Sequence, residues 1–173
     1  MRYIIIFLLA SVSIFSQVLV PQKTELNFVI DTRFGAAKGK FSNIAFSTLD
    51  FQNKKARLEI DVNTIDTGNS LRDKHLRSDD FFDTANHPKA VFEVYSIKEN
   101  GNVLMLSGKL TIKSIEKGLE FPVTMKDSPE AVQYTGEVEL KRSEFGITYN
   151  SVLNPISDKV KIKFQTNFEK KGK

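Results

Sequence analysis

Residues 65–94 read IDTGNSLRDKHLRSDDFFDTANHPKAVFEV and interrupt a chain whose apolar and polar residues otherwise alternate. The stretch begins with a polar turn, continues with apolar residues at helical spacing, and ends with the pair Phe81-Phe82 before alternation resumes. It matches no common catalytic signature. The sequence therefore predicts one short helix set between strands.

The predicted helix runs from Ser70 to Asp83 and has about two to three turns. Ser70 is a suitable N-cap residue, and we expect Asp73, three positions later, to complete a capping box at the positive end of the helix. His87 precedes a proline, which disfavours helical backbone at that residue and predicts extended chain. We expect the helix to lie across one end of a sheet.

Period-two alternation on both sides of the helix indicates half-buried strands with one apolar face. The eight predicted strands cover residues 26–30, 44–48, 56–62, 92–94, 104–112, 119–125, 132–140 and 160–168. Short turn segments at 50–54, 99–102 and 127–130 predict hairpins and antiparallel neighbours. The fold is therefore all-β, either a sandwich or a closed barrel, and strands of this length favour a tall barrel.

The first residues carry the features of a secretory signal peptide. A positive start, Met1-Arg2, precedes the mostly apolar run from Tyr3 to Phe15. That run is too short to cross a bilayer comfortably, and no second long apolar run follows it. We predict a signal peptide over residues 1–16, one domain over residues 17–173, and a protein exported to the periplasm or secreted.

Composition removes several classes of function. The chain of 173 residues has no cysteine, which excludes disulfides, thiolate metal ligands and a thiol nucleophile. The formal net charge is +4, and the basic residues are interspersed with acidic ones except in the tail, residues 170–173. A solvated tail accounts for that cluster better than a nucleic-acid contact does, so we expect no nucleic-acid partner.

Catalytic motifs are also missing from the sequence. His75 and His87 are too far apart for the compact helical pattern of zinc hydrolases. Ser70 and Ser78 do not lie in the Gly-x-Ser-x-Gly turn of a hydrolase. Glycine-rich residues 35–39 precede no helix that could bind a phosphate. We expect no enzymatic activity, no metal and no cofactor.

Ordered motifs over nearly the whole of residues 17–173 resemble the YceI-like family of exported lipid-binding proteins. The matching segments are 65–68, 72–78, 80–83, Pro88 with Val91-Phe92, 108–112, Pro122-Val123 and 142–147. Lys113-Ser114 stand where the family often has His-Gly, and Gly118 stands where a proline is usual. Both differences fall in one predicted hairpin, so they affect the expected shape of that turn more than the fold.

The resemblance implies an extended eight-stranded antiparallel β-barrel of lipocalin type with one short helix across one end. It also implies that a polyisoprenoid, such as a prenyl quinone or a prenol, is held in an apolar tunnel for transport or storage. The alternative is a secreted barrel with a quinone-linked electron-carrier role or a stress-related structural or interaction role. The implied partners are this lipid, a membrane met transiently, and a second copy in a homodimer.

The candidate ligand contacts are apolar side chains on inward-facing strand positions or on the helix. Alternation alone favours an ordinary barrel core at these positions, and the resemblance favours a tunnel lining instead. The apolar set is Phe28, Phe41, Phe46, Leu58, Ile60, Leu71, Leu76, Phe81, Phe82, Phe92, Leu110, Phe121, Phe145 and Ile147. Arg72 and His75 are the polar candidates, placed at the tunnel mouth.

Overall fold

The computed structural model describes residues 18–50, 53–149 and 151–171. The predicted signal peptide, residues 1–16, lies outside the described residues and remains a prediction. Among the described residues, no helix is both long enough and apolar enough to cross a membrane.

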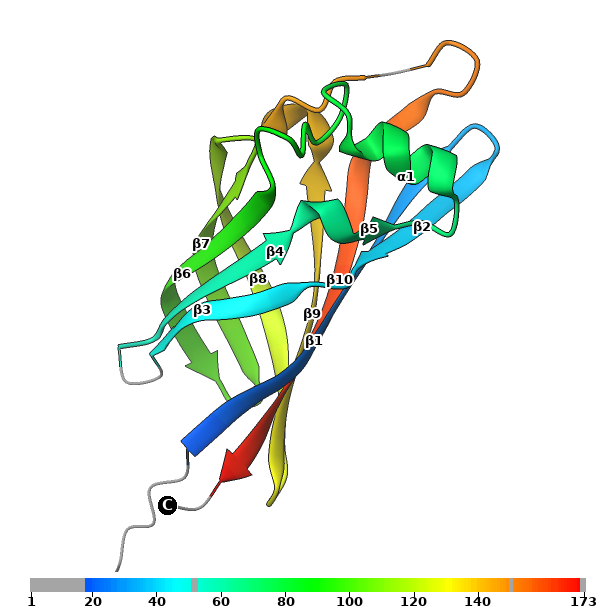
Figure 1. The fold of residues 1–173 in the computed structure, drawn as a ribbon. Coiled ribbons are helices and arrows are strands. Elements are labelled where there is room, and N and C mark those ends of the chain that lie inside the picture. Colours follow the sequence, from blue (N-terminus) through cyan, green and yellow to red (C-terminus); the bar gives the residue numbers. More distant parts are fainter. Residues whose placement is uncertain (1–17, 51–52, 150, 172–173) are drawn as a thin grey trace, which may run out of the picture.

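A single curled antiparallel sheet makes up most of the described chain (Figure 1). Its ten strands are β1 (Val18–Thr32), β2 (Gly35–Phe41), β3 (Ile44–Asp50), β4 (Lys55–Asp61), β5 (Ile65–Asp66), β6 (Lys89–Asn100), β7 (Val103–Ile112), β8 (Ile115–Asp127), β9 (Ala131–Lys141) and β10 (Ile156–Lys171). The order across the sheet is β3-β4-β6-β7-β8-β9-β10-β1-β2-β5. Two 3-10 turns, η1 (Val62–Thr64) and η2 (Arg142–Phe145), and one helix, α1 (Ser70–Arg77), complete the fold.

The curled sheet confirms the predicted all-β, lipocalin-like class. It forms a half-barrel, because within the described ranges no ladder of hydrogen bonds joins the terminal strands β3 and β5. The predicted count of eight strands was wrong, since β2 and β5 were missed. Strand β2 is built from glycine, alanine and lysine up to Phe41, so it lacks apolar alternation, and β5 has only two residues.

The single helix lies at one end of the sheet, as predicted, but it is shorter and starts differently (Figure 1). It ends at Arg77, and turns replace the remaining predicted residues up to Asp83. Ser70 is not the N-cap: Asn69 caps the helix, and its side chain accepts a hydrogen bond from Arg72 N–H at 3.0 Å. Asn caps as well as Ser, and this shift takes Asp73 out of the capping-box position.

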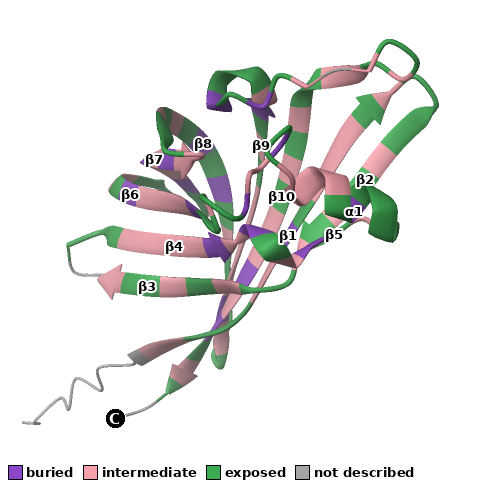
Figure 2. Cartoon of the chain, turned by 45° about the horizontal axis from the view of Figure 1, so that its top comes forward, coloured by how far each residue is buried: buried purple, intermediate pink, exposed green. Residues whose placement is uncertain are grey.

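The strand registers determine which side chains face inward. Leu58 pairs with Phe92, and Phe92 pairs with Leu110, so these three side chains share the concave face of β4, β6 and β7. The neighbouring row Arg57, Glu93 and Lys109 faces outward, where Arg57 and Lys109 both pair with Glu93. In Figure 2 buried or half-buried residues alternate with exposed ones along several strands, as in β8.

An ion-pair cluster on the outer face of β4 and β6 couples stability to acidic pH. Hydrogen bonds from Lys89, then from Ser47 and Arg57, lower the pKa of Glu59 to about 2. A depressed carboxyl pKa stabilises the fold above the unfolded value of about 4.3, and this contribution is lost as the pH falls toward 2.

We expect Glu59→Gln to reduce the loss of thermal stability between pH 4.5 and pH 2, because the variant lacks this titration. The measurement is the melting temperature followed by circular dichroism across that interval. Glu144→Gln is the control, since its carboxylate makes no ion pair within the described part of the chain. An equal acid-induced decrease in wild type and Glu59→Gln would contradict this assignment.

Candidate ligand-binding site

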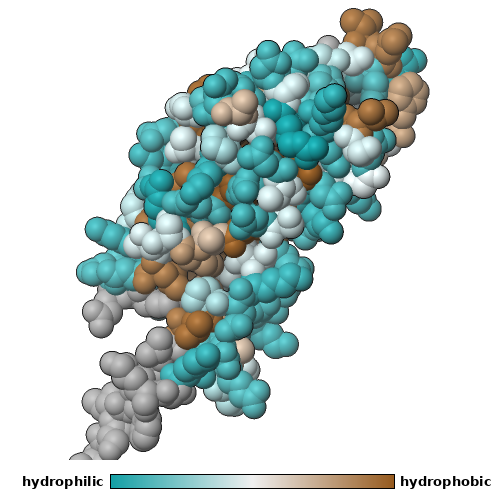
Figure 3. Space-filling view, in the orientation of Figure 1, coloured by the Kyte–Doolittle hydropathy of each residue, from teal (hydrophilic) through white to brown (hydrophobic). Residues whose placement is uncertain are grey.

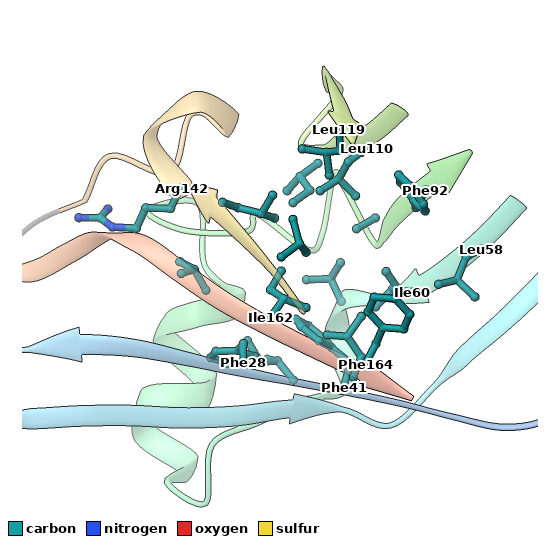
Figure 4. A pocket seen from close by; sticks show the side chains of 18 of the residues that line it. Phe28, Phe41, Leu58, Ile60, Phe92, Leu110, Leu119, Arg142, Ile162 and Phe164 are labelled. Carbon is teal, nitrogen blue, oxygen red and sulfur yellow. The ribbon is translucent and has the colours of Figure 1, made fainter. Parts of the chain in front are cut away.

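The concave side of the sheet encloses a cavity of about 1050 Å³ (Figure 4). Well-packed protein interiors contain few voids larger than a water molecule, and ligand pockets occupy roughly 300–1,000 Å³. The interior is therefore hollow on the scale of a ligand, and the inward-facing residues are not simply a filled core.

All fourteen predicted apolar contacts line this cavity, and so do Arg72 and His75. The strands supply the walls, with Phe28, Phe41, Phe46, Leu58, Ile60, Phe92, Leu110 and Phe121. The remaining residues, from α1, the turns after it and the segment that starts at η2, lie at the α1 end: Leu71, Arg72, His75, Leu76, Phe81, Phe82, Phe145 and Ile147. Whether each side chain contacts a ligand stays a prediction.

Two kinds of lining residue were missed by the sequence prediction. The first kind includes Leu119, Ile162 and Phe164, which lie on strands with clear alternation (Figure 4). The alternation pattern was a sufficient signal for these. The second kind, including Tyr149 and Asn154, comes from the segment between η2 and β10. That segment has no periodic pattern that could have identified them.

Three phenylalanine rings lie directly over glycines on neighbouring strands. A Cβ atom on Gly39 would stand 2.3 Å from Phe28 Cζ, one on Gly108 would stand 2.5 Å from Phe92 Cζ, and one on Gly136 would stand 2.5 Å from Phe164 Cζ. Because each ring occupies the space of a missing side chain, it lies against the wall. The glycines therefore keep the cavity open while the wall remains aromatic.

We expect Gly136→Ala to push the Phe164 ring into the cavity, reduce lipid uptake, and cost roughly 1–3 kcal/mol of stability through overpacking. Gly118→Ala is the matched control, because a Cβ there meets nothing within 4 Å and its backbone is not left-handed. Denaturant unfolding and lipid uptake measure the two effects. Equal stability and equal lipid uptake of the two variants would show that the position of the Phe164 ring does not depend on Gly136.

A hydrogen-bond network ties the start of α1 to Thr67, which directly follows β5. Asp73 is 8% exposed, and its carboxylate accepts hydrogen bonds from the Thr67 backbone N–H at 3.0 Å and from the Thr67 hydroxyl. Arg72 Nε donates to Thr67 Oγ1 at 2.8 Å, and its second guanidinium nitrogen donates to Thr67 O at 2.8 Å. This network positions the helix, so the roles found for Asp73 and Arg72 are structural.

His75 belongs to a ring cluster at the same end of the cavity. Its ring lies 5.0 Å from Phe81 and 4.8 Å from Tyr149, with edge-to-face geometry in both pairs. His75 Nε2 lies 3.1 Å from Asp80 Oδ2. The imidazole therefore connects α1 to the segment between η2 and β10, which closes part of the α1 end.

Arg142 fixes that segment in place. Its guanidinium donates to four backbone carbonyls, those of Ile147, Tyr149, Ile156 and Ser157, at distances between 2.7 and 3.2 Å. Arg142 also lines the cavity, and its guanidinium points away from the labelled apolar side chains (Figure 4). Its donors are directed at the backbone, so it shapes the α1 end of the cavity.

A buried polar atom lies at this end of the cavity. Asn154 Oδ1 is buried, and within the described part of the chain it accepts no hydrogen bond. Asn154 lines the cavity beside Tyr149 and Ser151. An acceptor in this position suits a hydroxyl group on a ligand, because a buried polar atom without a partner is costly.

The far end of the cavity carries charged residues near the β3–β4 and β6–β7 turns, where Lys54 Nζ lies 2.9 Å from Glu99 Oε1. Nearby, burial raises the pKa of the Tyr134 hydroxyl.

No group of three or more His, Cys, Asp or Glu side chains suited to a metal ion occurs among the described residues.

Comparison with known proteins agrees with this architecture. The family model for the YceI-like domain matches residues 18–168. The chain belongs to the YceI-like family. A UPF0312 protein of Pseudomonas aeruginosa is 34% identical over 138 residues, which cover 72% of this chain and 69% of the relative. The resemblance predicted from the motifs is thereby confirmed.

Two solved structures share the fold. Burkholderia cenocepacia BcnA is 25% identical, with a TM-score of 0.75 over 83% of this chain and 95% of BcnA. A second structure, from Saccharophagus degradans, is 18% identical, with a TM-score of 0.73 over 91% of this chain and 99% of the other. That protein is described as a polyisoprenoid binding domain implicated in plant cell wall breakdown.

Proposed function

We propose that this YceI-like protein is an exported, non-catalytic lipid-binding protein that holds one polyisoprenoid in its cavity for transport or storage. The observation that carries the proposal is the cavity of about 1050 Å³ lined by phenylalanine and aliphatic side chains. Such a wall makes dispersion contacts and has no polar groups that need a hydrogen-bond partner, which suits a chain of isoprene units. The polyisoprenoid-binding description of the Saccharophagus degradans neighbour supports the choice of ligand.

The expected affinity is high and comes from the tail. A chain of about 40 carbons at roughly 0.3 kcal/mol per heavy atom gains on the order of 12 kcal/mol, close to nanomolar binding. A bilayer accommodates the same tail equally well, so transfer from membrane to protein should be nearly neutral. Near-neutral transfer favours a reversible carrier over an irreversible sink.

The α1 end of the cavity is the better place for a polar head group. It combines the unpartnered acceptor Asn154 Oδ1 with the rings of His75 and Tyr149. A head group that donates an O–H, as in a prenol or a reduced quinone, would satisfy Asn154. We therefore propose that the tail fills the strand-lined interior and the head lies toward α1.

The test is lipid uptake from vesicles. Purified protein is incubated with phospholipid vesicles that contain a polyprenol or a prenyl quinone, the vesicles are removed by ultracentrifugation, and the supernatant is analysed by mass spectrometry. We expect up to about one prenyl lipid per protein in the supernatant. No prenyl lipid above the level of a protein-free control would refute the proposal.

A further inference from the structure

Four large apolar side chains are unusually exposed: Phe34 at 78%, Leu71 at 80%, Val152 at 94% and Leu153 at 78%. The other exposed large apolar residues of the described chain are Tyr95, Val103 and Ile115, at 62%, 41% and 38%. The four come from three segments that are distant in sequence: the β1–β2 hairpin, α1, and the segment between η2 and β10.

These three segments meet at one end of the molecule. Arg33 N–H donates to Pro155 O at 3.2 Å, which joins the tip of the hairpin to the segment before β10. Phe34 and Leu71 line the outer part of the cavity together with Ser151. In Figure 3 hydrophobic surface lies at the upper end of the molecule, where Figure 1 places the hairpin and the segment before β10. The four side chains therefore surround the α1 end of the cavity.

Basic residues accompany the apolar ones. Arg33 Cζ lies 5.8 Å from the centre of the Phe34 ring. On α1, Leu71 precedes the exposed residues Arg72 and Lys74, whereas the acid between them, Asp73, is buried against Thr67. Residues 148–155 contain no charged side chain. Exposed apolar groups beside cations are the pattern of a surface that enters the interface of an anionic bilayer.

We propose that this rim, made of Phe34, Leu71, Val152 and Leu153 with Arg33 and Lys74, docks on an anionic phospholipid bilayer. The proposal rests on the lipid-binding function above. Docking through this rim would place the α1 end of the cavity against the membrane that holds the lipid. Charge favours a bilayer over a second copy, because two rims face to face would bring like charges together. The start of β1 and the end of β10, which pair with each other, lie at the opposite end of the molecule (Figure 1).

Vesicle flotation tests the rim without any polyisoprenoid present, so its result is independent of the ligand. Wild type is mixed with vesicles of phosphatidylcholine, alone or with phosphatidylglycerol. We expect it to float with the anionic vesicles, and we expect Val152→Asp with Leu153→Asp to weaken this binding at least about tenfold. Arg33→Gln and Lys74→Gln should each weaken it by about fivefold.

Val103→Asp is the control, because Val103 is an exposed apolar residue at the start of β7, outside the rim. It should float like wild type, and melting temperatures confirm that each variant is folded. The double Asp variant changes no cavity residue, so it should still take up a prenol added from dilute ethanol. Wild type that does not float with anionic vesicles, or a folded double variant that floats equally well, would overturn the proposal. A wild-type dimer in solution that is lost when Val152 and Leu153 are replaced would also overturn it.

Discussion

Replacement of Phe92 by arginine should abolish uptake of prenyl lipids by a protein that still folds. Phe92 lies on the concave face between Leu58 and Leu110, and its ring centre is 5.5 Å from that of Phe121. An arginine there would place an unpaired cation among hydrocarbon groups, which costs several kcal/mol if a lipid tail excludes water from it. In the empty protein, water in the cavity can solvate the same charge. The measurement is uptake from prenyl-loaded vesicles.

Two further variants separate loss of binding from loss of folding. Tyr95→Arg adds the same charge on the same strand at a position that is 62% exposed, and it should leave uptake unchanged. Phe92→Leu keeps the wall apolar and should retain most uptake. Wild-type uptake by a folded Phe92→Arg variant would remove Phe92 from the ligand-contact set.

Replacement of Arg142 by leucine should cause a large loss of stability for a single substitution. The four carbonyls that Arg142 contacts span residues 147–157, and hydrogen bonds from a charged donor contribute about 1.5–3 kcal/mol each. Because freed carbonyls regain some water, we expect a net cost of about 3 kcal/mol. That corresponds to a decrease of roughly 6–12 °C in the melting temperature.

Arg142→Lys tests the geometric part of this account. Lysine keeps the positive charge but lacks the planar fork that reaches several carbonyls at once, so it should restore less than half of the lost stability. The free energy of unfolding in urea is the measurement. A cost below about 1 kcal/mol for Arg142→Leu would mean that the segment between η2 and β10 is held by other contacts.

Most of the cavity wall could be predicted because strand geometry alternates strictly. Apolar residues alternate with polar ones around Leu58, Phe92 and Leu110, so each was expected on the apolar face of its own strand. The observed registers bring these three faces together on the concave side. Strand β2 could not be predicted this way, since its glycines and alanines carry no apolar alternation. The N-cap was missed by one residue because Asn69 and Ser70 are equally suitable caps.

The presence of a cavity inside the curled sheet could not be deduced from alternation, because the same pattern fits a filled core. It depends on how far the sheet curls and on how rings pack against neighbouring strands, as Phe28 does over Gly39 and Phe164 over Gly136. The α1 end depends on a segment without periodicity, held by hydrogen bonds from Arg142 to backbone carbonyls 5 to 15 residues further along the chain. Only the family motifs indicated a tunnel from the sequence.

Identification of the natural ligand tests the central claim most directly. Protein purified from cells without detergent is extracted with organic solvent, and the extract is analysed by mass spectrometry against a protein-free control. The account predicts one class of prenyl lipid at up to about one molecule per protein, with a head group that distinguishes a quinone from a prenol or a phosphate. An extract without prenyl lipid, from protein that also fails to take up prenyl lipid from vesicles, would contradict it.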